Sequence, residues 1–169
     1  MNDPDNRPPV STSVNTTPII LPGKHIEGVT FSTDIEWDKQ GKPVIYVVGR
    51  GDARTPKEAL SVIATTVEMI NASHFEHVCS VYNMLDLTHL PMMARFINAG
   101  TFPSSPKTAH IIVGTRSQTI QLIASLSAVI GSRRLRTMEA CWSPEEIDQA
   151  VKRWLSMSDR TRAYTINDI

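Results

Sequence analysis

The 169-residue sequence has little of several features that often reveal function. Its two cysteines, Cys79 and Cys141, lie in apolar stretches and cannot build a disulfide framework. Its 17 basic and 17 acidic residues balance, so the overall basic bias of nucleic-acid-binding proteins is missing. No apolar run reaches the roughly 18 residues of a membrane span. We therefore expect a protein that binds no nucleic acid and has no membrane span.

Motifs that indicate an enzyme or a metal protein are also missing. The sequence has no Gly-x-Ser-x-Gly turn, no Walker A loop and no Gly-x-Gly-x-x-Gly fingerprint. His74 and His77 are spaced like a ligand pair, but too few further ligands accompany them for a closed metal site. Residues 1–9 lack the apolar core of a secretion signal. We expect a cytoplasmic protein with reduced cysteines, no catalytic residues, no metal and no cofactor.

The sequence does contain a regular alternation of strand-like and helix-like segments. A period-2 pattern places Val29, Phe31, Ile35 and Trp37 on one side of a half-buried strand. The turn residues 39–42 and the apolar run Val44–Val48 then complete an antiparallel hairpin. Further strands are expected at Val78–Asp86, Ala109–Gly114 and Leu135–Trp142, and helices at about Thr55–Asn71, Leu90–Ala99, Gln118–Ile130 and Glu145–Leu155.

Two of the expected helices carry clear start signals. Thr55 and Glu58 form a capping box with Pro56 at the first helical position, and Ser143–Glu146 repeats the arrangement. The last helix continues with the apolar stripe of a helix that faces a core: Ile147, Ala150, Val151, Trp154 and Leu155.

Strands that alternate with helices pair in parallel through helical crossovers. The sequence therefore predicts a single α/β domain over residues 28–156. It has a mixed, mainly parallel sheet, an N-terminal antiparallel hairpin and four helices. Residues 1–27 are expected to form a disordered or loosely attached tail, and residues 157–169 a C-terminal tail.

Four polar residues follow the ends of expected strands: Asp86, Thr88, Thr115 and Arg116. Ligands gather at the carboxyl ends of strands in sheets with helical crossovers, and helix N-termini favour anions. These four residues are our candidate ligand or regulatory site, and the partners expected for the whole chain include a small apolar or anionic ligand. In the structural alternative, Thr88 and Thr115 only cap helices and Asp86 fixes a loop.

The helix expected at Gln118–Ile130 has no charged residue between Ser117 and Ser132, and it is apolar on two faces. Such a helix must be covered twice. Neighbouring helices or a second chain would cover the face that carries Leu122, Leu126 and Val129, because exposed apolar patches usually mark interfaces. We predict a homodimer with this helix near the contact. The same helix could instead line a pocket for a lipid or another small apolar molecule.

In its order of elements the chain resembles the STAS family (sulfate transporter and anti-sigma-factor antagonist domains), and in particular its stand-alone STAS/SEC14-like members. The resemblance covers about residues 28–156. The matching stretches are Val44–Gly49, Asn83–Thr88, Ala109–Gly114 and Met138–Glu146, followed by Ala150 and Trp154-Leu155.

The resemblance implies a sheet with helices packed mainly on one side, no catalysis, and binding of partner proteins or small ligands, sometimes under phosphorylation control. Antagonist members carry an Asp-Ser-Ser-Gly-like acceptor motif at the start of the second helix. This chain has Thr88-His89-Leu90-Pro91-Met92-Met93 there, in which only Thr88 could accept a phosphate.

Three functional hypotheses follow. The favoured one is a non-catalytic STAS-like regulatory domain that binds a partner protein or its own copy. The second is a carrier of a small molecule or lipid, and the third is an enzyme of an unrecognised type. An internal cavity without converging polar groups would favour the carrier, whereas a cleft with strongly perturbed titratable groups would favour the enzyme.

Overall fold

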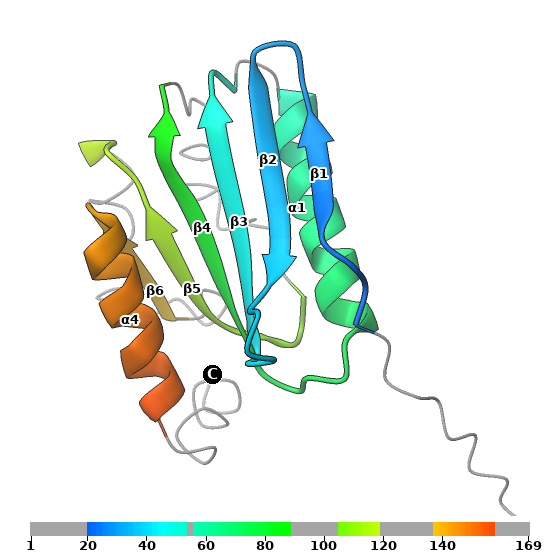
Figure 1. Cartoon of the computed structure of the whole chain (residues 1–169), viewed down its shortest axis with the longest axis vertical. Coiled ribbons are helices and arrows are strands. Elements are labelled where there is room, and N and C mark those ends of the chain that lie inside the picture. The colour runs from blue at the N-terminus through cyan, green and yellow to red at the C-terminus, as the bar shows by residue number, and fades with distance from the viewer. Residues whose placement is uncertain (1–19, 54–55, 89–104, 119–136, 158–169) are drawn as a thin grey trace, which may run out of the picture.

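The computed structural model describes residues 20–53, 56–88, 105–118 and 137–157. Within these ranges six strands form one sheet, in which they follow one another in sequence order (Figure 1). The elements are β1 Lys24–Glu27, β2 Phe31–Trp37, β3 Val44–Gly51, α1 Pro56–Ala72, β4 Val78–Leu87, β5 Thr108–Gly114, β6 Thr137–Cys141 and α4 Pro144–Ser156. Strands β1 to β3 pair antiparallel, and β3 to β6 pair parallel. The predicted mixed α/β sheet with an antiparallel start is confirmed.

Two of the four expected helices, α1 and α4, fall within the described residues. The expected helix Leu90–Ala99 and nearly all of Gln118–Ile130 lie outside them, as do the predicted interface residues Leu122, Leu126 and Val129. Neither described helix is long and apolar enough to cross a membrane.

The sheet begins earlier than the sequence predicted. Strand β1 lies inside the range 1–27 that was assigned to a loose tail, and it pairs with β2 from Lys24↔Ile35 to Glu27↔Ser32. The predicted domain start at residue 28 is therefore corrected to include β1. The pattern gave no strand signal because an edge strand is held by backbone hydrogen bonds, whatever its side chains. Of the four residues of β1, only Ile26 packs against the core.

The two described helices lie on opposite faces of the sheet (Figure 1). Side chains alternate between the faces along each strand. In β4, Val78, Tyr82 and Met84 join the core beneath α1, whereas Cys79 and Val81 join the core beneath α4. The prediction that four helices pack mainly on one side stays a prediction, because two of them lie outside the described residues and the two described helices do not share a face. The handedness rule for crossovers constrains α1, which links parallel strands, but not α4, which follows the last strand.

Helix α4 forms as its sequence predicts. The Ser143 side chain accepts a hydrogen bond from the Glu146 backbone N–H at 3.3 Å, and Pro144 opens the helix. The Glu146 carboxylate in turn accepts one from the Trp142 N–H at 2.8 Å. The side chains of the predicted stripe that become fully buried are Ile147, Ala150, Val151 and Trp154.

The apolar side of β2 differs from the prediction at one end. Val29 is 97% exposed, because it lies in the β1–β2 turn that the Gly28 N–H closes on the Phe31 carbonyl at 2.7 Å. The inward positions are Phe31, Thr33 and Ile35, all buried. A threonine therefore takes a place in the core beneath α1.

Candidate functional site

The four residues predicted as a ligand site share one edge of the sheet. Asp86 lies near the end of β4 and Thr88 just beyond it, while Thr115 and Arg116 follow the neighbouring β5. Asp86, Thr88 and Arg116 are exposed, but Thr115 is only 1% exposed. The structure thus brings the carboxyl ends of these strands together as expected, and ligand binding there stays a prediction.

The two threonines of this set hold strand ends together. The Thr88 N–H and hydroxyl both donate to the Gly51 carbonyl, at 2.9 and 3.3 Å, and so join the ends of β3 and β4. The Thr115 N–H donates to the Cys141 carbonyl at 2.9 Å, which joins β5 to β6. The Thr115 hydroxyl accepts from the Ser117 N–H at 3.1 Å. These contacts give both threonines a structural role at the strand ends, while the helices that they would cap in the structural alternative lie outside the described residues.

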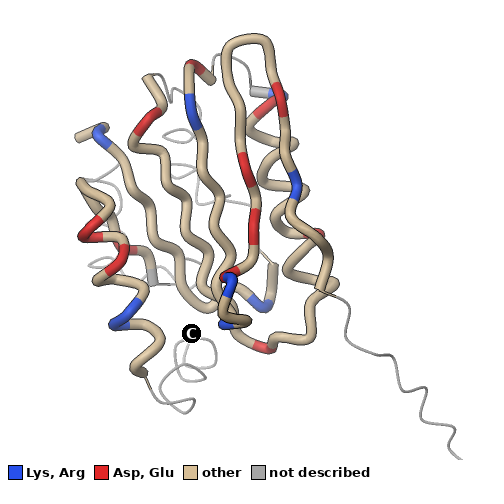
Figure 2. The backbone as a smooth tube through the Cα atoms, viewed as in Figure 1, with Lys and Arg blue, Asp and Glu red and all other residues tan. Residues whose placement is uncertain are grey.

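Charged residues of both signs are interspersed over the described strands and helices (Figure 2). No group of three or more His, Cys, Asp or Glu side chains within the described ranges could hold a metal ion. His74 of the pair considered in the sequence instead stacks on Phe75, with ring centroids 4.1 Å apart.

An ion-pair cluster joins β1, β2 and β3 on the exposed side of the sheet. Asp34 contacts the His25 Nδ1 and the Arg50 guanidinium, each at 2.6 Å, and Glu27 contacts the His25 Nε2 at 2.7 Å. Hydrogen bonds to Asp34 and then Glu27 raise the pKa of His25. The bonds from His25 and then Arg50 lower the pKa of Asp34. The cluster ties the edge strand to its neighbours and leaves these side chains partnered.

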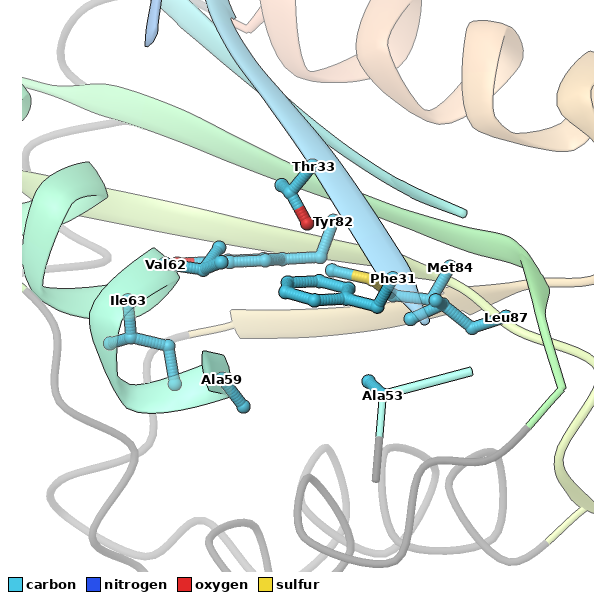
Figure 3. A pocket seen from close by; sticks show the side chains of 9 residues that line it. All are labelled: Phe31, Thr33, Ala53, Ala59, Val62, Ile63, Tyr82, Met84 and Leu87. Atoms are coloured by element: carbon cyan, nitrogen blue, oxygen red, sulfur yellow. The ribbon is translucent and has the colours of Figure 1, made fainter. Parts of the chain in front are cut away.

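A different site lies between α1 and the sheet. Nine residues of the described ranges line this hollow, which we call the α1 pocket: Phe31, Thr33, Ala53, Ala59, Val62, Ile63, Tyr82, Met84 and Leu87 (Figure 3). Its cavity measures about 30 Å³, and the hollow counted out to its open mouth about 340 Å³. The half-buried Ala53, Ala59 and Leu87 border the mouth, and the other lining residues are buried. Ala53 lies just after the end of β3, and Leu87 is the last residue of β4. The mouth therefore opens at the carboxyl ends of parallel strands.

Small residues make the room for this pocket. Ala53 and Ala59 present only methyl groups at the mouth. Gly49 of β3 lets Met84 and Leu87 lie close above the strand, because a Cβ there would be 2.9 Å from the Met84 Sδ and 3.1 Å from the Leu87 Cδ1. A side chain at this glycine would displace two of the lining residues.

The floor of the pocket contains a hydroxyl group without a partner. Thr33 is 1% exposed, and its Oγ1 makes no hydrogen bond within the described part of the chain. Figure 3 shows this oxygen directed into the space beside Phe31 and Tyr82. Leaving a buried hydroxyl unpaired costs about 1–3 kcal/mol. The unmet hydrogen bond of Thr33 thus lies beside a cavity whose described lining is otherwise mainly apolar.

The other polar group of the described lining, the Tyr82 hydroxyl, already has a hydrogen-bond partner. The Tyr82 side chain hydrogen-bonds Thr66 of α1, whose hydroxyl donates to the Val62 carbonyl at 2.8 Å. Burial raises the pKa of Tyr82 above the usual range for tyrosine, so its hydroxyl stays neutral. Tyr82 therefore contributes mainly its ring to the pocket.

Sequence reasoning did not find the α1 pocket. Its lining comes from β2, from the link after β3, from α1 and from β4, and no local pattern connects these segments. One signal was present. Thr33 stands between Phe31 and Ile35 on the side of β2 that was predicted to be apolar. A polar residue at a core position needs a partner, and asking for that partner points to the pocket.

Comparisons with protein-family models, with curated proteins and with solved structures each found no match to this chain. Its function is therefore inferred from the geometry of the described residues.

Proposed function

We propose that this chain is a non-catalytic binding domain that holds a small, mainly apolar ligand in the α1 pocket. The observation that carries the proposal is the pocket itself, an apolar hollow with a buried floor and a half-buried mouth. Small-molecule sites are typically concave and apolar with a few polar groups. In sheets with helical crossovers they gather where this mouth opens, at the carboxyl ends of the strands.

Two of the hypotheses from the sequence predict different chemistry at such a site. A carrier needs an apolar cavity, and apart from Thr33 and Tyr82 each lining residue within the described ranges is apolar. An enzyme needs an acid, a base or a nucleophile, and the lining that the described residues form contains no carboxylate, histidine, lysine or cysteine. The pocket therefore favours binding over catalysis. It is built on α1, whereas the sequence suggested the helix at 118–130.

The cysteines are poor candidates for nucleophiles. Cys79 and Cys141 belong to the core beneath α4, on the other face of the sheet from the α1 pocket. Burial raises the pKa of Cys79 above the usual range for a thiol, and it raises that of Cys141 to about 11. Both side chains are thus protonated thiols at neutral pH, and the thiolate is the reactive form.

The resemblance to STAS domains agrees with this proposal, because it implies binding without catalysis and includes small ligands among the molecules bound. A protein partner was the first expectation from the sequence. The α1 pocket favours a small ligand instead, because its cavity of about 30 Å³ is narrow and the described residues around its buried Thr33 hydroxyl are mainly apolar. Binding of a partner protein without any small ligand is the main rival outcome.

Xenon provides a direct test, because it enters small apolar cavities without specific chemistry. Methyl NMR spectra recorded under increasing xenon pressure should show saturable shifts at Val62, Ile63 and Met84, which line the pocket. Methyl groups beneath α4, such as those of Val151, should shift much less.

Two variants on one helix make the test specific. Ala59→Leu adds three carbon atoms at the mouth and should abolish the saturable shifts. Ala64→Leu makes the same change on the exposed side of α1 and should leave them as in the wild type. Equal shifts in the wild type and in Ala59→Leu would show that the α1 pocket is not a binding site.

A further inference from the structure

The unpartnered hydroxyl on the pocket floor defines the ligand more narrowly. We infer that the α1 pocket takes an uncharged aliphatic molecule that ends in one hydrogen-bonding oxygen, such as a short linear primary alcohol or aldehyde. Its oxygen pairs with the Thr33 Oγ1, and its chain runs out between Ala53, Ala59 and Leu87. This inference rests on the proposed binding function and adds the chemical class of the ligand.

The position of Thr33 sets the direction of the ligand. Thr33 is buried at 1% exposure, whereas the residues around the mouth are half-buried and apolar. The polar atom of the ligand must therefore lie at the floor of the pocket, and its apolar part must lie toward the mouth. A hydroxyl group can both donate and accept, so either an alcohol or a carbonyl oxygen satisfies Thr33.

The size of the cavity sets the shape of the ligand. An engineered cavity of about 150 Å³ holds a benzene molecule. The α1 cavity, at about 30 Å³, is too small for a ring and holds a terminal oxygen with one or two carbon atoms. The remaining carbons lie in the wider part of the hollow, against Met84 and Leu87. A linear chain meets both conditions.

The chemistry of the lining sets the charge of the ligand. Among the described residues no lysine, arginine or histidine lines the pocket, so a carboxylate or phosphate at its buried floor would be desolvated without a counter-charge from them. A single water molecule is also a poor occupant, because a buried water needs two to four polar partners. Thr33 offers one, and the Tyr82 hydroxyl is already bonded to Thr66.

A matched pair of probes separates the hydrogen bond from the apolar contact. Butan-1-ol and n-butane share an alkyl chain, and only the alcohol can bond to Thr33. Dissociation constants for both are measured by methyl NMR on the full chain, for the wild type and for Thr33→Val, which replaces the hydroxyl with a methyl group of similar size. We expect Thr33→Val to lower the preference for the alcohol over the alkane about tenfold, the effect of one lost hydrogen bond.

Further variants exclude an effect of folding. Thr33→Ser keeps the hydroxyl and should retain the wild-type preference even if Thr33→Val is poorly folded. Thr65→Val makes the same chemical change on α1, where the Thr65 hydroxyl donates to the Ser61 carbonyl at an exposed position, and it should behave as the wild type.

Each result has a distinct meaning. An alcohol preference that is the same in the wild type, Thr33→Val and Thr33→Ser overturns the role of Thr33 but leaves the pocket as an apolar site. Loss of the preference in Thr33→Ser also overturns that role, because this variant retains the oxygen. Failure of both probes and of xenon to bind the wild type overturns the proposed function as well.

Discussion

Ile147 of α4 packs directly onto Gly114 of β5, so closely that any side chain at Gly114 would overlap the Ile147 Cδ1. Both residues are buried, Ile147 in the core beneath α4. The missing side chain of one residue thus sets how near the last helix approaches the sheet. Several stability predictions concern this face and the opposite one.

Gly114→Ala should lower the free energy of unfolding by about 1–3 kcal/mol, because the added methyl group overpacks the contact with Ile147. Ile147→Val removes the overlapping carbon, so the double variant should be little less stable than Ile147→Val alone. Urea unfolding of all four proteins measures this coupling. Simple additivity of the two substitutions would mean that α4 adjusts its position freely.

Trp154→Ala should cost about 3–5 kcal/mol, because Trp154 is 3% exposed in the core beneath α4 and truncation leaves a large cavity. Trp142 supplies a matched control. Its side chain is 51% exposed, so Trp142→Ala should change stability by much less. Equal shifts in the urea midpoint for the two variants would contradict the burial assigned to α4.

Thr33→Val and Thr66→Val should change the stability of the ligand-free protein in opposite directions. Thr33 has a buried hydroxyl without a partner, so removing it should raise the free energy of unfolding by about 1–2 kcal/mol. Thr66 is also buried, but it bonds Val62 and Tyr82, so its removal should cost about 1–3 kcal/mol. A loss of stability in both variants would indicate that the Thr33 hydroxyl has a partner. A higher free energy of unfolding in Thr33→Val would show that the native threonine lowers the stability of the protein, as binding residues often do.

The contribution of His25 to stability should depend on pH. Hydrogen bonds to Asp34 and Glu27 raise the pKa of His25 above its ordinary value of 6.5. A raised folded-state pKa contributes stability that is complete below 6.5 and is lost as pH rises through the folded-state value. The stability difference between the wild type and His25→Ala should therefore be larger near pH 6, below the ordinary pKa of 6.5, than near pH 9.

Chemical denaturation at both pH values measures the His25 effect, with Lys24→Ala on the same strand as the control. The lowered pKa of Asp34 predicts a second loss of stability at acidic pH. That stability is present above the ordinary pKa of 3.8 and disappears as pH falls through the folded-state value. A His25→Ala difference that does not vary between pH 6 and 9 would show that the ion pairs are not formed in solution.

Much of the fold follows from local patterns in the sequence. The period-2 and continuous apolar runs located β2 to β6, and the Ser143-Pro144 start with its stripe located α4, because strand periodicity and helix capping act between residues a few positions apart. The sequence also placed Asp86 and Arg116 after the ends of two strands, and these strands are neighbours in the sheet.

Other properties depend on contacts between distant segments, and only the tertiary structure decided them. The docking of β1 comes from backbone pairing with β2, which a strand with one apolar side chain does not signal. The placement of α1 and α4 on opposite faces depends on how each helix leaves the sheet. The α1 pocket exists because side chains from β2, α1 and β4 leave a space around Thr33. The sequence by itself located β2 to β6, α1 and α4, because the patterns that mark them are local. The packing of the helices against the sheet determined where an apolar hollow with one free hydroxyl remains.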